Sequence, residues 1–121
     1  MSFSFTGDKP IYIEIAEQLE DSIFVGIYPE GTQIPSTTEL SVSLQINPAT
    51  VLKGMNLLVD EGIIYKKRGL GMFVCDGAVA KIRTKRRNNF NNDYIVPLLS
   101  EAKKLNLSQE DIIALIKGGE K

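Results

Sequence analysis

The sequence predicts a mainly α-helical chain with one small β-hairpin (α+β). Apolar residues recur with a helical period in several separate segments, and one short stretch changes to the alternation of strands. Glycine, proline and asparagine residues separate these segments, as they do at turns. The length of 121 residues fits one domain with a short appendage.

Composition narrows the classes of function. Apolar residues make up 43% and charged residues 24%, which is typical of a folded globular chain. No apolar run approaches the roughly 20 residues of a membrane span, and the start MSFSFTGDK lacks the pattern of a secretory signal. We therefore expect neither membrane insertion nor secretion. With Cys75 as the single cysteine and no histidine, nothing supports an internal disulfide, an enzyme, a metal or another cofactor.

The first predicted helix follows Pro10, whose missing N–H costs nothing in a first turn. An apolar residue recurs at every fourth position: Ile11, Ile15, Leu19 and Ile23. Polar residues fill the other faces, so one stripe of this helix is expected to be buried. The pattern stops at Gly26.

Two short helices are predicted next. Ser36 followed by Glu39 forms a capping box, in which each side chain accepts a hydrogen bond from the backbone of the other residue. After the break at 45–47, Asn47 can cap a third helix and Pro48 takes its first position. The inward apolar positions are Leu40, Leu44, Val51, Met55, Leu58 and Val59. Two short helices joined by about three residues form a helix-turn-helix.

A β-hairpin is predicted directly after Gly62. Residues 63–65 are typical of a strand, Lys66 to Gly71 of a tight basic loop, and 72–75 of the returning strand. A helix, a helix-turn-helix and a basic-tipped hairpin in this order indicate a winged helix-turn-helix. We assign it to residues 1–77.

Residues 78–121 are expected to form a helical tail. Residues 79–82 can start a helix, which the asparagines at 88, 89, 91 and 92 would weaken. A helical stripe resumes at Tyr94, Pro97 kinks or restarts it, and Ser108 with Asp111 caps a last helix. These amphipathic helices cannot bury both faces against one small domain, so we expect a second copy of the chain to cover them. The alternative is packing onto the first helix. The expected dimer interface is Tyr94, Ile95, Leu98, Leu99, Ala102, Leu105, Ile112, Ile113 and Ile116.

Charge is distributed unevenly behind a net charge of −1. Two basic and nine acidic residues precede Ile63, whereas twelve basic and six acidic residues follow from there on. Between Ile63 and Arg87, eight basic side chains oppose only Asp76. Such asymmetry fits an anionic partner such as nucleic acid, or a face that is merely solvated. For Lys81 to Arg87 both interpretations stay open.

The motifs from Pro10 to Val74 resemble the GntR family of bacterial transcription regulators. The matching stretches, in order, are PIYIEIAEQLEDSIFVGIYPEGTQIPS, TEL, INPATV and LVDEGIIYKKRGLGMFV. Asn47-Pro48 and a tail of only about 45 residues resemble the YtrA-like subgroup. The resemblance implies a cytoplasmic homodimer that binds double-stranded DNA, most often as a repressor, with the tail as its dimerisation element. Two recognition helices would then lie ~34 Å apart on an inverted-repeat operator.

The resemblance also implies the residues that contact DNA. In the family these lie at the start of the second helix, at the start of the third and at the tip of the hairpin, or wing. The matching positions here are Ser36, Thr37, Thr38, Asn47, Pro48, Ala49, Thr50, Lys53, Arg68, Gly69, Leu70 and Gly71. Thr38 stands where family members commonly carry arginine. Ala49 replaces a frequent polar residue, and its methyl group can meet a thymine methyl but cannot donate a hydrogen bond.

Simpler interpretations stay open. Asn47 and Thr50 can serve only as helix caps, and the wing tip can be an ordinary solvated turn. A winged-helix module that docks an acidic protein through its basic segment is the alternative function. Binding that depends on DNA sequence would separate the two. No cluster of polar residues marks a site for a small-molecule effector.

Overall fold

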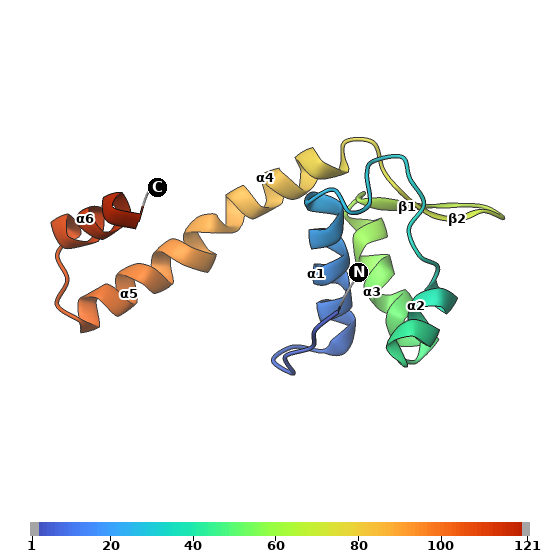
Figure 1. Cartoon of the computed structure of the whole chain (residues 1–121), viewed down its shortest axis with the longest axis horizontal. Helices are drawn as coiled ribbons and strands as arrows, with labels where there is room; N and C mark the ends of the chain where they lie inside the picture. The colour runs from blue at the N-terminus through green and yellow to red at the C-terminus, as the bar shows by residue number, and fades with distance from the viewer. Residues whose placement is uncertain (1–2, 120–121) are drawn as a thin grey trace. The chain divides into compact units, whose positions relative to one another are not determined.

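The structure is a computed structural model that describes residues 3–119 (Figure 1). Its elements in chain order are α1 (Ile11–Phe24), α2 (Thr37–Leu44), α3 (Pro48–Asp60), β1 (Ile64–Lys67), β2 (Gly71–Val74), α4 (Ala78–Phe90), the π-helix η1 (Asn91–Ile95), α5 (Val96–Lys104) and α6 (Gln109–Gly119). This mostly helical architecture with one antiparallel hairpin confirms the predicted fold class. The chain divides into two compact units, residues 1–84 and 85–121. The outermost residues of the two expected domains, 1–2 and 120–121, lie outside the described residues.

The core of the first unit lies where α1 packs on α3. Its fully buried large side chains are Ile15, Leu19, Ile23, Val51, Met55, Leu58, Ile63, Ile64, Val74 and Ile82. The predicted stripe of α1 is buried except for Ile11, which is 45% exposed. A Cβ at Gly54 would lie 2.6 Å from the carbonyl oxygen of Tyr12. A glycine at this position therefore lets α3 approach α1 closely and fixes its place on the core.

Both helices of the helix-turn-helix begin at the predicted caps. Ser36 Oγ accepts a hydrogen bond from the Glu39 N–H at 3.0 Å, and Glu39 Oε1 accepts one from the Ser36 N–H at 3.2 Å. Asn47 Oδ1 accepts a hydrogen bond from the Ala49 N–H at 2.8 Å, and α3 begins at Pro48. Between the helices, Gln45 has a φ of 55°. This left-handed conformation ends α2 and turns the chain toward α3.

The strands of the wing have other bounds than predicted, because Ile63 and Cys75 lie outside them and Lys66, Lys67 and Gly71 lie inside. Lys66 pairs with Met72 and Lys67 with Gly71, so the strands extend to residues that we expected in the loop. The turn is accordingly shorter, and the Leu70 N–H donates to the Lys67 carbonyl at 2.9 Å. The reason is that lysine side chains stand clear of an exposed hairpin, so their backbone is free to pair. Gly69, with a φ of 78°, supplies the positive φ of the turn.

The segment before α2 runs along the second edge of β2. The Ile34 N–H donates to the Met72 carbonyl at 3.0 Å, and the Val74 N–H donates to the Thr32 carbonyl at 3.0 Å. The side-chain amide of Gln33 donates to the carbonyl of Leu70 at 2.6 Å. These bonds tie the wing to the loop that leads into α2, so the first unit carries the wing and the helix-turn-helix together (Figure 1).

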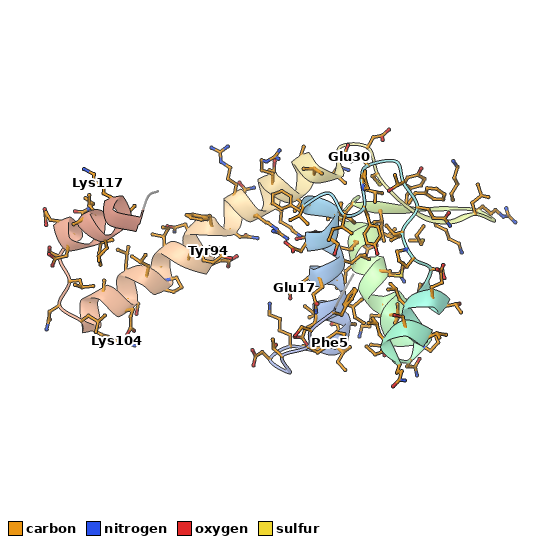
Figure 2. All side chains as sticks on the ribbon, in the orientation of Figure 1. Phe5, Glu17, Glu30, Tyr94, Lys104 and Lys117 are labelled. Atoms are coloured by element: carbon orange, nitrogen blue, oxygen red, sulfur yellow. The ribbon has the colours of Figure 1, made fainter. Side chains whose placement is uncertain are left out.

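The helix α4 begins inside the first unit. Ala78 and Ile82 are fully buried in its core, and the compact unit therefore extends through Thr84. Glu30 accepts hydrogen bonds from the Gly77 N–H at 2.8 Å and the Val79 N–H at 3.0 Å (Figure 2). A carboxylate at the start of α4 satisfies backbone N–H groups that have no partner within the helix. A functional boundary at residue 77 stays a prediction.

The asparagine cluster changes the helix without breaking it. The helix α4 continues through 88–89, and Asn91 and Asn92 then open the π-helix η1. The Val96 N–H donates to the Asn91 carbonyl, five residues back. Pro97 follows in the first turn of α5, where it has no N–H to donate to the preceding turn. The expected weakening is therefore a local change of hydrogen-bonding pattern.

In the second unit, the turn from α5 to α6 follows its predicted break. Asn106 has a φ of 58°, and the Leu107 N–H donates to the Ala102 carbonyl at 2.9 Å, as at a Schellman helix end. Ser108 and Asp111 cap α6 reciprocally, with backbone-to-side-chain distances of 2.9 and 3.1 Å. The predicted cap of the last helix is thus confirmed. Among residues 3–119, no helix has the length and apolar content needed to cross a bilayer.

Candidate nucleic-acid interface

The helix α3 buries one face and exposes another. Val51, Gly54, Met55 and Leu58 are buried, at the i, i+3, i+4 and i+7 spacing of a helix packed on a core. The positions between them that are exposed in the first two turns and a half are Pro48, Ala49, Leu52, Lys53 and Asn56. A helix held by its buried face against α1 presents this second face to a partner, as a recognition helix does.

Lys53 is the one basic residue of α3 and takes an unexpected place. Its ammonium nitrogen lies 4.1 Å from the centroid of the Tyr12 ring, on α1. A cation over an aromatic face is attracted by the ring quadrupole. The resemblance to the GntR family predicts that this side chain contacts DNA. In the structure it is exposed but is held at the boundary between α3 and α1.

At the start of α2, two of the three predicted hydroxyls have partners inside the chain. Ser36 caps the helix. Thr37 is half-buried, and its hydroxyl lies 3.3 Å from the sulfur of Met55. Thr38 is exposed. A hydroxyl can accept one hydrogen bond and donate another, so the Ser36 oxygen can cap the helix while its proton reaches a phosphate.

At the start of α3, the cap and the candidate contacts coincide. The side-chain oxygen of Asn47 is used by the Ala49 N–H, which leaves its NH₂ group as a donor toward solvent. Pro48 and Ala49 are exposed, whereas Thr50 is half-buried. The capping role of Asn47 is therefore observed. Contact of these residues with DNA stays a prediction.

The wing exposes its tip. Arg68, Gly69 and Leu70 are exposed, and Gly71 is half-buried. A Cβ at Gly71 would lie 2.6 Å from the side-chain amide nitrogen of Gln33, so glycine makes room for the bond between Gln33 and the turn. Lys67 lies 5.2 Å from the centroid of the Phe73 ring, which in turn stacks on Tyr65. The tip thus presents a guanidinium on a hairpin whose base is fixed by aromatic and backbone contacts.

Two cations of the basic segment Lys81 to Arg87 have partners within the first unit. Lys81 Nζ donates to the Gly62 carbonyl at 3.1 Å, where a positive charge is favoured at the carboxyl end of α3. The Arg83 guanidinium lies 5.8 Å from the centroid of the Phe24 ring. These two side chains therefore brace α4 against the domain. The basic side chains of the wing are all exposed to solvent, whereas two of those in the segment Lys81 to Arg87 are half-buried.

The Glu30 carboxylate has an electrostatic environment set by α4. The backbone N–H groups of Gly77 and Val79 hold its pKa below the usual range, because they stabilise the charged form. This residue gave no signal in the sequence, since it lies in a turn 47 residues before its partner. Gln33, Asn56 and Tyr12 were missed as well. Of these, only Asn56 had a usable signal, because it lies seven positions after Ala49 on the same helical face.

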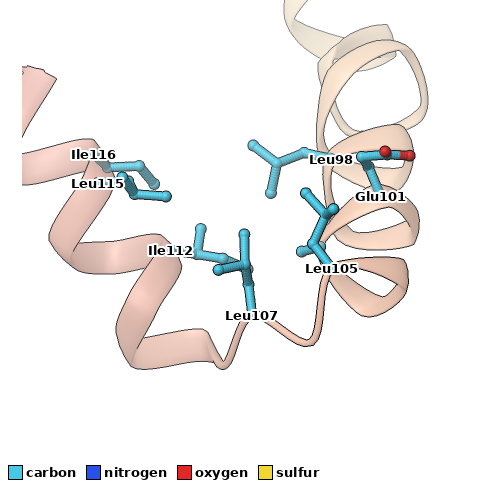
Figure 3. Close-up of a pocket in the computed structure, with 8 residues that line it drawn as sticks. Leu98, Glu101, Leu105, Leu107, Ile112, Leu115 and Ile116 are labelled. Atoms are coloured by element: carbon cyan, nitrogen blue, oxygen red, sulfur yellow. The ribbon is translucent and has the colours of Figure 1, made fainter.

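The expected dimer residues of the tail are mostly open to solvent. Exposed side chains are Tyr94 (labelled in Figure 2), Leu98, Leu99, Leu105, Ile113 and Ile116, while Ile95 and Ile112 are half-buried and Ala102 is buried. Between α5 and α6 lies an apolar hollow of about 420 Å³ (Figure 3). It is lined by Leu98, Glu101, Ala102, Leu105, Leu107, Ile112, Leu115 and Ile116. The two helices of this unit therefore leave apolar surface that they do not cover themselves.

No group of acidic and cysteine side chains within residues 3–119 is suited to hold a metal ion.

An outward face on the second helix of a helix-turn-helix, beside an anchored basic hairpin, defines the class of winged helix-turn-helix proteins. Residues 11–74 match the family described as bacterial regulatory proteins, gntR family. The chain belongs to this GntR family, which confirms the resemblance seen in the sequence. It is a transcription regulator with a DNA-binding winged helix.

Two of the three proteins compared here match nearly the whole chain, and the third matches its winged-helix part. The HTH-type transcriptional repressor YtrA of Bacillus subtilis (strain 168) is 30% identical over 119 residues, covering 93% of this chain and 91% of that protein. A GntR family transcriptional regulator from Listeria monocytogenes is 30% identical with a TM-score of 0.78, covering 96% of this chain and 100% of that one. AraR(DBD), solved in complex with operator ORX1, is 26% identical with a TM-score of 0.57, covering 62% of this chain and 96% of that one. Both the winged-helix part and the tail thus have counterparts of similar length, as expected of a YtrA-like regulator.

Proposed function

We propose that this regulator is a cytoplasmic repressor that binds an inverted-repeat operator as a homodimer. The observation that carries the proposal is the exposed face of α3, held against α1 by buried residues and accompanied by a wing that Gln33 fixes beside the helix-turn-helix. The name of the B. subtilis relative, a transcriptional repressor, supports the direction of regulation.

The start of α3 enters the major groove in this proposal. Asn47, Ala49 and Thr50 then lie against base edges or phosphates, and the helix N-terminus itself favours the anionic backbone. Ser36, Thr37 and Thr38 lie at the N-terminus of α2, a second place where backbone N–H groups can meet a phosphate. Because α3 offers only one cation and Tyr12 holds it, affinity depends more strongly on the wing.

The wing supplies the principal charged contact. Arg68 is exposed at the tip, and the glycines on either side of Leu70 allow the backbone to approach DNA closely. A guanidinium fits a narrow minor groove, where A·T tracts concentrate negative potential. Lys66 and Lys67 precede it on β1 and are exposed as well, so they reinforce attraction to the phosphates.

The homodimer forms through the tail. The exposed leucines and isoleucines of α5 and α6, together with the hollow between these helices, form an apolar surface that a second copy would cover. A two-fold axis relates identical surfaces, so the two α3 helices would meet equivalent half-sites. The spacing of those half-sites should be one DNA turn, ~34 Å, or a multiple of it.

Selection of duplexes from a random pool tests the proposal. The full chain should enrich an inverted repeat, and binding to it should persist when unselected duplex is added in excess. Ala49→Glu should abolish the enrichment because it places a carboxylate on the exposed face of α3. Ala80→Glu, the same change at an exposed position of α4, is the matched control and should bind normally. Equal binding to every duplex would refute sequence-specific recognition.

A further inference from the structure

We propose that Leu52 is a specificity-determining residue that recognises the methyl group of a thymine in each half-site. This inference rests on the proposed function, because it assigns a base to one position of the helix proposed to enter the major groove. It goes further in naming which chemical group of the operator is read and by which side chain.

The first argument is the place of Leu52 on α3. It is 46% exposed, although the helix buries Val51 before it and Gly54 and Met55 after it. Leu52 lies three positions after Ala49 and four before Asn56, so these three side chains share one outward face. Leu52 belongs neither to the buried core nor to the half-buried side chains packed against it, and nearly half of its surface is exposed. Its apolar surface is available to a partner.

The second argument is that the one cation of α3 lies at the edge of the exposed face and not among Ala49, Leu52 and Asn56. Lys53 is the only cation of α3, and its ammonium lies over the Tyr12 ring at the side of the helix toward α1. Arginine and lysine are the residues that bind guanine in the major groove, through its O6 and N7 atoms. The central outward face instead carries a methyl, an isobutyl group and an amide. It therefore suits A·T pairs better than G·C pairs.

The third argument is chemical. Among the base edges in the major groove, the C5-methyl of thymine is the apolar group that distinguishes one base pair from the others. An isobutyl side chain cannot donate or accept a hydrogen bond, so it can discriminate only by burying apolar surface. Removing one methyl from such a contact should weaken binding about fourfold per half-site, the equivalent of one buried CH₂ group.

Replacement of thymine by uracil measures this contact directly. Uracil lacks the C5-methyl and keeps the O4 atom and the pairing with adenine. In the selected operator duplex, each thymine of one half-site is replaced in turn, and dissociation constants are measured with the full chain. One replacement should weaken binding about fourfold. Leu52→Ala should bind the thymine duplex more weakly by a similar factor and should no longer distinguish thymine from uracil at that position.

A matched control separates this contact from a general effect. Val42→Ala shortens another exposed aliphatic side chain, on α2, and should keep the full sensitivity to uracil. If the wild-type chain tolerates uracil at every position, or if Leu52→Ala keeps the same sensitivity, the inference is wrong while the sequence-specific binding stands. If the random pool yields no selected duplex, both the inference and the proposed function fail.

Discussion

The ammonium of Lys53 lies 4.1 Å from the centre of the Tyr12 ring and joins the recognition helix α3 to the first turn of α1. The same two helices approach closely at Gly54, whose absent side chain leaves room for the Tyr12 carbonyl. The pair therefore lies at the contact that orients α3. A residue expected to extend toward DNA contributes to the position of the helix that carries it.

A double-mutant cycle measures this contact. Tyr12→Leu, Lys53→Met and the double variant are unfolded with urea, and the free energies of unfolding are compared. The coupling energy should be about 0.5–1 kcal/mol, because Lys53 is exposed, Tyr12 is half-buried, and the pair is only partly desolvated. Additive effects of the two substitutions would show that the ring and the ammonium do not interact in solution.

The free energy of unfolding should depend on pH through Glu30, whose carboxylate accepts hydrogen bonds at the start of α4. The folded state lowers the pKa of Glu30, so its contribution is present above the ordinary carboxyl pKa and is lost as pH falls through the lowered value. Glu30→Gln should lower the melting temperature at neutral pH, with a smaller difference from wild type in acid. Melting curves from neutral to acidic pH check this. A difference between Glu30→Gln and wild type that stays the same from neutral to acidic pH would contradict this role.

The hydrogen bond between Gln33 and the wing should matter more for operator binding than for the stability of the fold. Gln33→Met keeps the length of the side chain and removes the donor to the Leu70 carbonyl. Operator affinity should fall severalfold, while urea unfolding should change by about 1 kcal/mol or less, as for one exposed hydrogen bond. Unchanged affinity would mean that the backbone ladder of β2 alone orients the wing.

Arg68 should contribute to the salt dependence of binding. Arg68→Ala should weaken operator binding and reduce the slope of log K against log salt by about one unit, because one phosphate contact is lost. Fluorescence anisotropy titrations at several salt concentrations measure both. Lys117→Ala removes an exposed cation of α6 and should leave the slope unchanged. A normal slope for Arg68→Ala would place the wing outside the groove.

The tail interface can be tested by a single charge. Leu99 is 51% exposed on the apolar face of α5, and Ser100 beside it points about 100° away. Leu99→Glu should shift the chain to monomer by light scattering, whereas Ser100→Glu should stay dimeric. The monomeric variant should bind one half-site and lose its preference for the inverted repeat. A dimer that survives Leu99→Glu would place the interface elsewhere.

Local chemistry accounts for the parts of the fold that the sequence predicts well. The caps at Ser36, Asn47 and Ser108 depend on residues at most three positions apart, so spacing alone identifies them. The buried stripes of α1 and α3 follow from the helical period. Strand-like residues on either side of a glycine-containing turn predict the hairpin, but they do not predict its strand ends, because Lys66 and Lys67 pair within the ladder despite their charge.

The contacts that the sequence does not predict join segments that lie far apart in the chain. Glu30 caps a helix that begins 48 residues later, and Gln33 meets a carbonyl 37 positions away. The place of Lys53 depends on the packing angle of α3 against α1, which no pattern within either helix specifies. Lys81 and Arg83 likewise have partners outside their own segment, within the first unit. Whether the segment Lys81 to Arg87 also contacts DNA stays open.

The division of α3 into a buried face and an outward face has a consequence for evolution. Ala49, Leu52 and Asn56 are exposed and lie outside the core, so, if α3 reads the operator as proposed, substitutions there would change the preferred operator at little cost in folding stability. New regulatory targets could then arise one substitution at a time on an unchanged scaffold. A library randomised at these three positions should therefore contain folded variants with other operator preferences.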